Sequence, residues 1–225
     1  MGYDLYVVTD REVGRGLSHL DQARLAVAGG ADVVQMRDKT MNTSALLREA
    51  RAVRAVTAAA GALFIVNDRL DVALAVGADG VHLGQDDLPV EEARVLAPPG
   101  FIVGLSVGDV AEAVESVAGG ADYVALSPTF STTSKADAGP GHGLATLRAV
   151  RSAVSVPVLA IGGIGPENVA DVIAAGADGV AVISAVVGQE DVTAAARTMK
   201  NLVAAAKSAP HLSGAREKAG DDGAF

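Results

Sequence analysis

The sequence contains no cysteine, and aromatic residues make up only 3% of its 225 residues. The lack of cysteine excludes disulfides, thiolate metal sites and cysteine nucleophiles. The low aromatic content argues against a surface on which single-stranded nucleic acid stacks. Basic residues are also few, because 18 Lys and Arg against 27 Asp and Glu give a net charge of −9. We therefore expect no nucleic-acid partner, and any anionic ligand has to be bound by a local basic cluster.

Long apolar runs are missing as well. No stretch reaches the length of about 18 residues that a membrane-spanning helix requires. The first ten residues, MGYDLYVVTD, lack the basic start of a signal peptide. We therefore expect a soluble cytoplasmic protein with no membrane partner. Hydrophobic residues make up 50% of the chain, and a chain of this length buries roughly 70% of its unfolded surface, which is enough for a single domain.

A Gly-Ala-Asp triplet recurs, beginning at residues 30, 77, 120 and 176. In each copy a helical segment ends at glycine and an apolar strand follows. One further apolar strand candidate precedes each copy, at residues 5–8, 63–66, 101–104 and 156–161. This alternation predicts a closed (β/α)₈ TIM barrel over residues 1–207. An open doubly wound sheet is the alternative, because periodicity does not show closure. Residues 208–225 have little apolar content and are expected to form a disordered tail.

Polar residues concentrate where the predicted strands end, and in a barrel these ends converge on one face. Gln35, Arg37 and Lys39 occupy alternate positions and so share one side of an extended segment. A guanidinium and an ammonium placed together favour phosphate binding. A solvated strand edge is the alternative interpretation.

Asp68 and Asp87 follow two neighbouring strands of the predicted barrel. Because parallel strands lie about 4.8 Å apart, both carboxylates can face one small volume. Such a pair suits Mg²⁺, which uses one or two carboxylates and completes its shell with substrate phosphate and water. Each carboxylate could instead cap the helix that follows it, the second near Pro89. Asn67 fits either a ligand contact or an Asx turn.

Two later segments add anion-binding features. The loop 129–142 contains hydroxyls and Lys135, so it is a candidate lid over phosphate. The segment IGGIGP at 161–166 precedes a helix expected to start near Pro166, and free N–H groups at a helix start attract anions. The four histidines show no metal-ligand spacing, and His82, inside a strand, is read as a packed or orienting residue.

These motifs together resemble the thiamine phosphate synthase family. The resemblance covers about residues 5–187 and rests on QMRDK at 35–39, FIVND at 64–68, GVHLGQDD at 80–87, GLS at 104–106, TTSK at 132–135, IGGI at 161–164 and VIS at 182–184. Two departures occur. Ser134 stands where the family commonly has threonine, and KADAGPGHG replaces a proline-richer loop, which affects the expected geometry of the lid.

The resemblance implies a transferase that joins a pyrimidine methyl diphosphate to a thiazole (carboxylate) phosphate, giving thiamine phosphate and pyrophosphate. It assigns Mg²⁺ to Asp68 and Asp87. It assigns the pyrimidine diphosphate to Gln35, Met36, Arg37, Asp38, Lys39, Asn67, Ser106 and Lys135. It assigns the thiazole phosphate to Thr132, Thr133, Ser134, Gly163, Ile183 and Ser184. The catalytic residues would be Arg37, Lys39, Ser106 and Lys135.

The expected mechanism needs neither a strong base nor a protein nucleophile. A leaving diphosphate carries about three negative charges, which the metal and the basic side chains neutralise as the carbon–oxygen bond breaks. Three alternatives stay open: a related barrel that tautomerises the thiazole phosphate or binds it as a regulator, a non-enzymatic phosphate-binding protein, and a phosphosugar isomerase, although no acid and base pair for the last is found. The sequence does not indicate an oligomeric state.

Overall fold

The computed structural model describes residues 2–132 and 139–209. Within them, parallel strands pair in sequence order and β8 pairs with β1, so the sheet closes into a barrel. The strands are β1 (Leu5–Thr9), β2 (Val33–Met36), β3 (Leu63–Asn67), β4 (Gly80–Leu83), β5 (Ile102–Val107), β6 (Tyr123–Leu126), β7 (Val158–Ile161) and β8 (Gly179–Val182). The predicted (β/α)₈ barrel is thus confirmed, and the open-sheet alternative is wrong.

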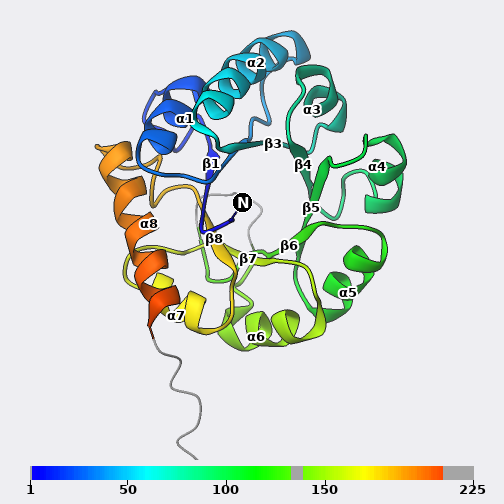
Figure 1. The fold of residues 1–225 in the computed structure, drawn as a ribbon, viewed down its shortest axis with the longest axis vertical. Helices are drawn as coiled ribbons and strands as arrows, with labels where there is room; N and C mark the ends of the chain where they lie inside the picture. Colours follow the sequence, from blue (N-terminus) through cyan, green and yellow to red (C-terminus); the bar gives the residue numbers. More distant parts are fainter. Residues whose placement is uncertain (1, 133–138, 210–225) are drawn as a thin grey trace, which may run out of the picture.

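A ring of helices surrounds the strands, one after each strand (Figure 1). They are α1 (His19–Ala28), α2 (Thr43–Ala60), α3 (Leu70–Val76), α4 (Val90–Leu96), α5 (Val110–Ala118), α6 (Gly143–Ala153), α7 (Val169–Ala174) and α8 (Val192–Ser208). Among the described residues, no helix is long and apolar enough to cross a membrane. The cytoplasmic location stays a prediction, as does the domain boundary at 207. The predicted disordered tail lies outside the described residues from 210 onward.

Local sequence signals account for most helix ends. Asn42 caps α2 by accepting a hydrogen bond from the Ala45 N–H, and Asp109 caps α5 through the Glu112 N–H. Helix α3 ends at Gly77, whose φ of 63° is a left-handed conformation that glycine adopts without strain. At these helix ends the chain turns back toward the sheet, where the next strand begins.

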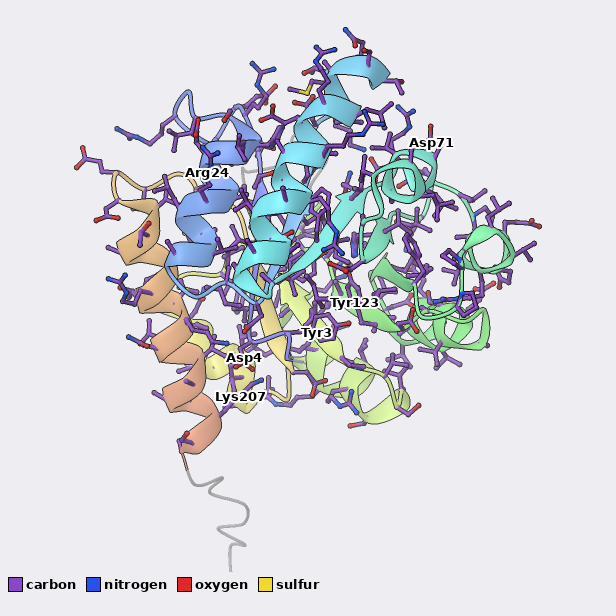
Figure 2. All side chains as sticks on the ribbon, turned by 45° about the horizontal axis from the view of Figure 1, so that its top comes forward. Tyr3, Asp4, Arg24, Asp71, Tyr123 and Lys207 are labelled. Atoms are coloured by element: carbon purple, nitrogen blue, oxygen red, sulfur yellow. The ribbon has the colours of Figure 1, made fainter. Side chains whose placement is uncertain are left out.

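The interior of the barrel contains two completely buried tyrosines, Tyr6 on β1 and Tyr123 on β6. The Tyr123 ring lies against β5, where a Cβ on Gly104 would be 2.0 Å from the ring. Only glycine at position 104 therefore leaves room for this ring. Tyr3, just before β1, lies close to Tyr123, with ring centroids 5.3 Å apart and ring planes tilted by 39° (both residues are labelled in Figure 2). The amino-terminal end of the barrel is thus filled by aromatic side chains.

The Gly-Ala-Asp triplets have a common role at the amino-terminal ends of the strands. Each aspartate carboxylate accepts the backbone N–H of the first or second residue of the preceding strand. Each carboxylate also pairs with a basic side chain on a helix. The four sets are Asp32 with Leu5 and Lys200, Asp79 with Phe64 and Arg54, Asp122 with Val103 and Arg94, and Asp178 with Val158 and Arg151. The repeat therefore stabilises the barrel.

Replacing Asp122 by alanine should lower the free energy of unfolding by about 1–3 kcal/mol, because the Val103 N–H and the Arg94 guanidinium lose an acceptor. Asp122→Asn keeps an oxygen for the N–H and loses only the charge, so its effect should be smaller. Urea unfolding of the three proteins measures the difference. An Asp122→Ala protein as stable as wild type would contradict the stabilising role.

Candidate functional site

A cavity of about 560 Å³ opens at the carboxyl ends of the strands. Its wall includes residues at or just beyond the ends of β2 to β8. Ten residues singled out from the sequence line it: Arg37, Lys39, Asn67, Asp68, Asp87, Ser106, Thr132, Gly163, Ile183 and Ser184. Asp68 and Asp87 thus lie at the same rim as Arg37, which the proposed metal and anion site requires.

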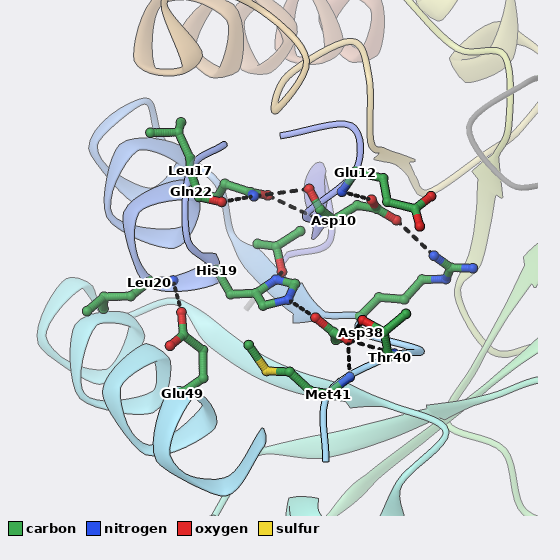
Figure 3. A network of polar contacts seen from close by, with 12 residues as sticks. Asp10, Glu12, Leu17, His19, Leu20, Gln22, Asp38, Thr40, Met41 and Glu49 are labelled. Carbon is green, nitrogen blue, oxygen red and sulfur yellow. Dashed lines mark hydrogen bonds and ion pairs between the residues drawn. The ribbon is translucent and has the colours of Figure 1, made fainter. Parts of the chain in front are cut away.

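Arg37 is held in place at the cavity wall by Asp10. The Arg37 guanidinium donates to Asp10 Oδ2 over 2.8 Å, and the side chains are only 13% and 8% exposed. The other oxygen, Asp10 Oδ1, accepts the backbone N–H group of Glu12 (Figure 3) and that of Val13. Arg37 is therefore an oriented cation within a pocket, and the alternative of a solvated strand edge does not describe it.

Three residues of the segment 35–39 do not line the cavity. Successive side chains of an extended segment point to opposite sides, so Met36 and Asp38 face the helices while Arg37 and Lys39 face the cavity. Met36 is packed in the core, and Asp38 Oδ2 lies 3.0 Å from Nε2 of the buried His19 (Figure 3). Gln35 lies deeper in the barrel and donates to the Tyr6 hydroxyl. The structure thus gives Gln35, Met36 and Asp38 supporting positions below or behind the wall.

Asp38 fixes the turn that follows β2. Its Oδ1 accepts the N–H groups of Thr40 and Met41. Burial raises the pKa of Asp38, but the hydrogen bonds from His19, Thr40 and Met41 outweigh burial and lower the pKa to about 2. The ionised carboxylate therefore stabilises the fold.

This pKa predicts a loss of stability in acid. The folded-state pKa of about 2 lies below the ordinary value of 3.8, so the contribution is complete above about pH 4 and is lost as the pH falls toward 2. The shift corresponds to about 2 kcal/mol. Urea unfolding between pH 5 and pH 2 should therefore show a smaller acid loss for Asp38→Asn than for wild type. Equal losses would show that Asp38 is not the group responsible.

Asp68 and Asp87 form a carboxylate pair in the cavity wall. Lys39 Nζ lies 2.6 Å from Asp68 Oδ2. Burial raises the pKa of Asp87, and the neighbouring Asp68 carboxylate raises it further against the opposing effect of the Gly84 N–H. Asp68 also has a φ of 60°, an unusual value for a residue other than glycine that is often found at functional sites. The two carboxylates are thus held close together beside Lys39, where a divalent cation would further relieve the repulsion between their ionised forms.

The structure excludes helix capping as the role of these two aspartates. The N-cap residues of α3 and α4 are Arg69 and Pro89, and neither helix start has a side-chain cap bond. Among the described residues, no three His, Asp or Glu gather into a metal-binding group. A pair of hard oxygen donors, with the remaining positions left to substrate and water, is the arrangement that Mg²⁺ favours.

The opposite part of the cavity is built around Gly162 and Gly163. Both have positive φ, 99° and 62°, and a Cβ on Gly163 would lie 2.7 Å from the Ser131 carbonyl oxygen. The backbone N–H groups of Thr129 and Phe130 donate to Ile161 and Gly162. These contacts seat the loop after β6 on the glycine turn after β7, so glycine is needed for this close approach.

Helix α7 begins at Val169 rather than at the predicted Pro166. The reason is Asn168, whose Oδ1 accepts the Gly165 N–H and whose Nδ2 donates to the Gly163 carbonyl. The predicted helix start is therefore wrong, and the binding of an anion by N–H groups near Pro166 stays a prediction. The positive-φ glycines of the turn are the cavity-lining element.

Three predicted site residues lie outside the part of the chain that the structure describes, and other residues that line the cavity were not predicted from the sequence. Thr133, Ser134 and Lys135 are outside the described residues. Glu112 and His142 line the cavity, although neither was singled out for it. Glu112 accepts from the Gly108 N–H over 2.6 Å and from the Gln85 side chain. Glu112 follows Asp109 by three residues, which is the spacing of a helix-capping pair, and this local pattern does not reveal that the carboxylate borders the cavity.

Comparisons with known proteins agree with this geometry. A family model described as thiamine monophosphate synthase matches residues 5–186. A thiamine-phosphate synthase from Methanoculleus marisnigri is 69% identical over 92% of this chain and 99% of its own length. One from Methanoregula boonei is 60% identical over 92% of this chain and 96% of its own. A solved thiamine phosphate pyrophosphorylase from Pyrococcus furiosus has a TM-score of 0.84 and 42% identity, covering 91% of this chain and 96% of the other. The similarity therefore includes all the strands of the barrel.

Proposed function

Because the chain belongs to the thiamine monophosphate synthase family, we propose that its cavity joins a pyrimidine methyl diphosphate to a thiazole (carboxylate) phosphate. The products are thiamine phosphate and pyrophosphate, together with carbon dioxide when the thiazole carries the carboxylate, which makes the protein a transferase of thiamine biosynthesis. The observation that carries the proposal is the convergence of Arg37, Lys39, Asp68 and Asp87 in one cavity. Two cations and a metal-binding carboxylate pair are what a departing diphosphate requires.

The pyrimidine diphosphate occupies the part of the cavity bordered by these four residues. Arg37, oriented by Asp10, and Lys39 hold the phosphate oxygens and offset the negative charge that grows as the carbon–oxygen bond breaks. Asp68 and Asp87 would hold Mg²⁺, which supplies further charge neutralisation at the leaving diphosphate. Lys39 leaves its contact with Asp68 to reach the substrate, because ligand oxygens compete for its ammonium group.

The thiazole phosphate takes the part of the cavity bordered by Gly163, Ile183 and Ser184. In this arrangement the thiazole nitrogen would face the pyrimidine methylene carbon, which becomes carbocation-like as diphosphate departs. The nitrogen lone pair forms the new bond without loss of a proton, so no general base is needed. Catalysis then depends on positioning and charge neutralisation.

A related barrel that tautomerises the thiazole phosphate, or binds it as a regulator, is the second candidate. Such a protein needs a site for a phosphomonoester and has no use for a diphosphate site. Such a protein would not need the diphosphate site formed by Arg37, Lys39, Asp68 and Asp87. The convergence of these four residues therefore favours the synthase.

The deciding experiment incubates the purified chain with both substrates and Mg²⁺ and measures pyrophosphate and thiamine phosphate. Both products should appear in equal amounts and only when both substrates and the metal are present. Omitting each component in turn is the control. Tight binding of the thiazole phosphate with no pyrophosphate release would contradict the synthase and support the regulator.

A further inference from the structure

A chain of hydrogen bonds crosses the inside of the barrel beneath the cavity. Gln35 Nε2 donates to the Tyr6 hydroxyl over 2.7 Å, and the Tyr6 hydroxyl lies 3.0 Å from that of Tyr123. The Tyr123 hydroxyl lies 2.9 Å from His82 Nδ1, and His82 Nε2 lies 2.9 Å from Ser106 Oγ. The chain thus joins residues of β2, β1, β6, β4 and β5 and ends at the cavity wall.

The direction of donation along this chain follows from hydrogen-bond satisfaction. The Gln35 amide can only donate through Nε2, so the Tyr6 oxygen accepts. If Tyr123 also donated to Tyr6, no side chain that the structure describes as a partner of the Tyr6 hydroxyl could accept its proton, which costs about 1–3 kcal/mol. Among the described residues, no buried side-chain nitrogen or oxygen lacks a partner. Tyr6 therefore donates to Tyr123, and by the same reasoning Tyr123 donates to His82 Nδ1.

A donor at Nδ1 fixes the state of the histidine ring. Nδ1 of His82 has to be an acceptor, so the proton of the neutral ring is on Nε2 and is donated to Ser106 Oγ. Once Ser106 accepts this bond, its own hydroxyl proton is available to an acceptor in the cavity that Ser106 lines. Burial raises the pKa of both Tyr6 and Tyr123, so both hydroxyls keep their protons.

We propose that Tyr6, Tyr123 and His82 are positioning residues that make Ser106 a directed hydrogen-bond donor to the bound pyrimidine diphosphate. The proposal rests on the proposed function for the identity of the ligand. The tyrosines act through His82 and Ser106 and do not contact the substrate, from which Tyr123 is three and Tyr6 four hydrogen bonds away. Gly104 belongs to the same device, since its missing side chain gives the Tyr123 ring the room to reach His82.

The state of the His82 ring is tested without substrate by ¹⁵N NMR of histidine-labelled protein, with His82→Asn to assign the signals. Wild type should show His82 protonated on Nε2 and bare at Nδ1. Tyr123→Phe should shift the ring toward the Nδ1-protonated form. Tyr3→Phe is the matched control, because it removes a hydroxyl from the ring packed against Tyr123 but outside the chain. A wild-type His82 protonated on Nδ1 would overturn the proposal.

Kinetics of pyrophosphate release then test the link to Ser106. Ser106→Ala should lower kcat about 100-fold, as loss of a positioned donor does, and Tyr123→Phe about tenfold. If Tyr123 acts through Ser106, adding Tyr123→Phe to Ser106→Ala should lower kcat by no more than about twofold. Tyr3→Phe should stay within about twofold of wild type.

Full additivity of Tyr123→Phe and Ser106→Ala, or a loss in Tyr3→Phe equal to that in Tyr123→Phe, would overturn the proposal by showing a purely structural effect. Thermal unfolding of each variant identifies any loss due to misfolding. If wild type releases no pyrophosphate, the proposed function fails, whereas the NMR experiment still decides whether the chain sets the ring of His82.

Discussion

Replacing Asp68 or Asp87 by alanine is expected to lower Mg²⁺-dependent pyrophosphate release by about 1,000-fold or more, since a metal at a leaving group contributes several kcal/mol to the transition state. Both carboxylates line the cavity, and the Asp68 carboxylate raises the pKa of Asp87, so a cation is needed to keep both groups ionised side by side. The Mg²⁺ concentration dependence should also shift, so that the residual activity needs more metal. Initial rates across a Mg²⁺ titration measure both effects.

The matched control is Asp71→Ala. Asp71 is an exposed aspartate on α3, paired with Arg69 and outside the cavity, so its loss should leave the rate and the metal dependence within about twofold of wild type. Each variant should keep a cooperative unfolding transition. Undiminished turnover in a folded Asp68→Ala or Asp87→Ala protein would refute the assignment of that residue to the metal.

Arg37→Ala should reduce kcat by about 100- to 1,000-fold, because a preorganised cation at the leaving diphosphate is removed from a partly buried position. Arg37→Lys should recover only part of the loss, since an ammonium cannot bond Asp10 and phosphate with the same planar fork. Steady-state rates at saturating concentrations of both substrates give kcat directly.

Two further variants separate charge from orientation. Arg69→Ala removes an exposed arginine from the next loop outside the cavity and should leave kcat unchanged. Asp10→Asn keeps Arg37 but weakens the bond that orients it, so kcat should fall by about tenfold. If Asp10→Asn had no effect while Arg37→Ala was inactive, the guanidinium would act without needing Asp10.

The fold could be predicted from the sequence because its signals are local. The Gly-Ala-Asp triplets mark where a helix ends and a strand begins, and residues such as Asn42 cap the helices through bonds to the next turn. Closure of the sheet was only an expectation, because the pairing of β8 with β1 joins distant segments. The predicted start of α7 was wrong because two side-chain hydrogen bonds of Asn168 shape the turn before the helix.

The site could be predicted where the alternation of side chains along a strand determines which of them face the cavity. Arg37 and Lys39 share a side, which follows from period two, and the same rule turns Met36 and Asp38 away from the cavity. Contacts between distant positions gave no sequence signal: His19 meets Asp38 and His82 meets Tyr123 only in the folded barrel. The metal, the lid residue Lys135 and the ligand contacts of single residues stay predictions.

The carboxylates of the Gly-Ala-Asp triplets have one more consequence. The barrel divides into four βαβα quarters, each with one triplet. Each triplet carboxylate bonds a strand of its own quarter and a basic side chain on the last helix of the preceding quarter, so these contacts link successive quarters. The contact between Lys200 on α8 and Asp32 joins the last quarter to the first. Since no peptide bond crosses that seam, hydrogen exchange should find the earliest opening of the barrel between β8 and β1, at the rim away from the chemistry.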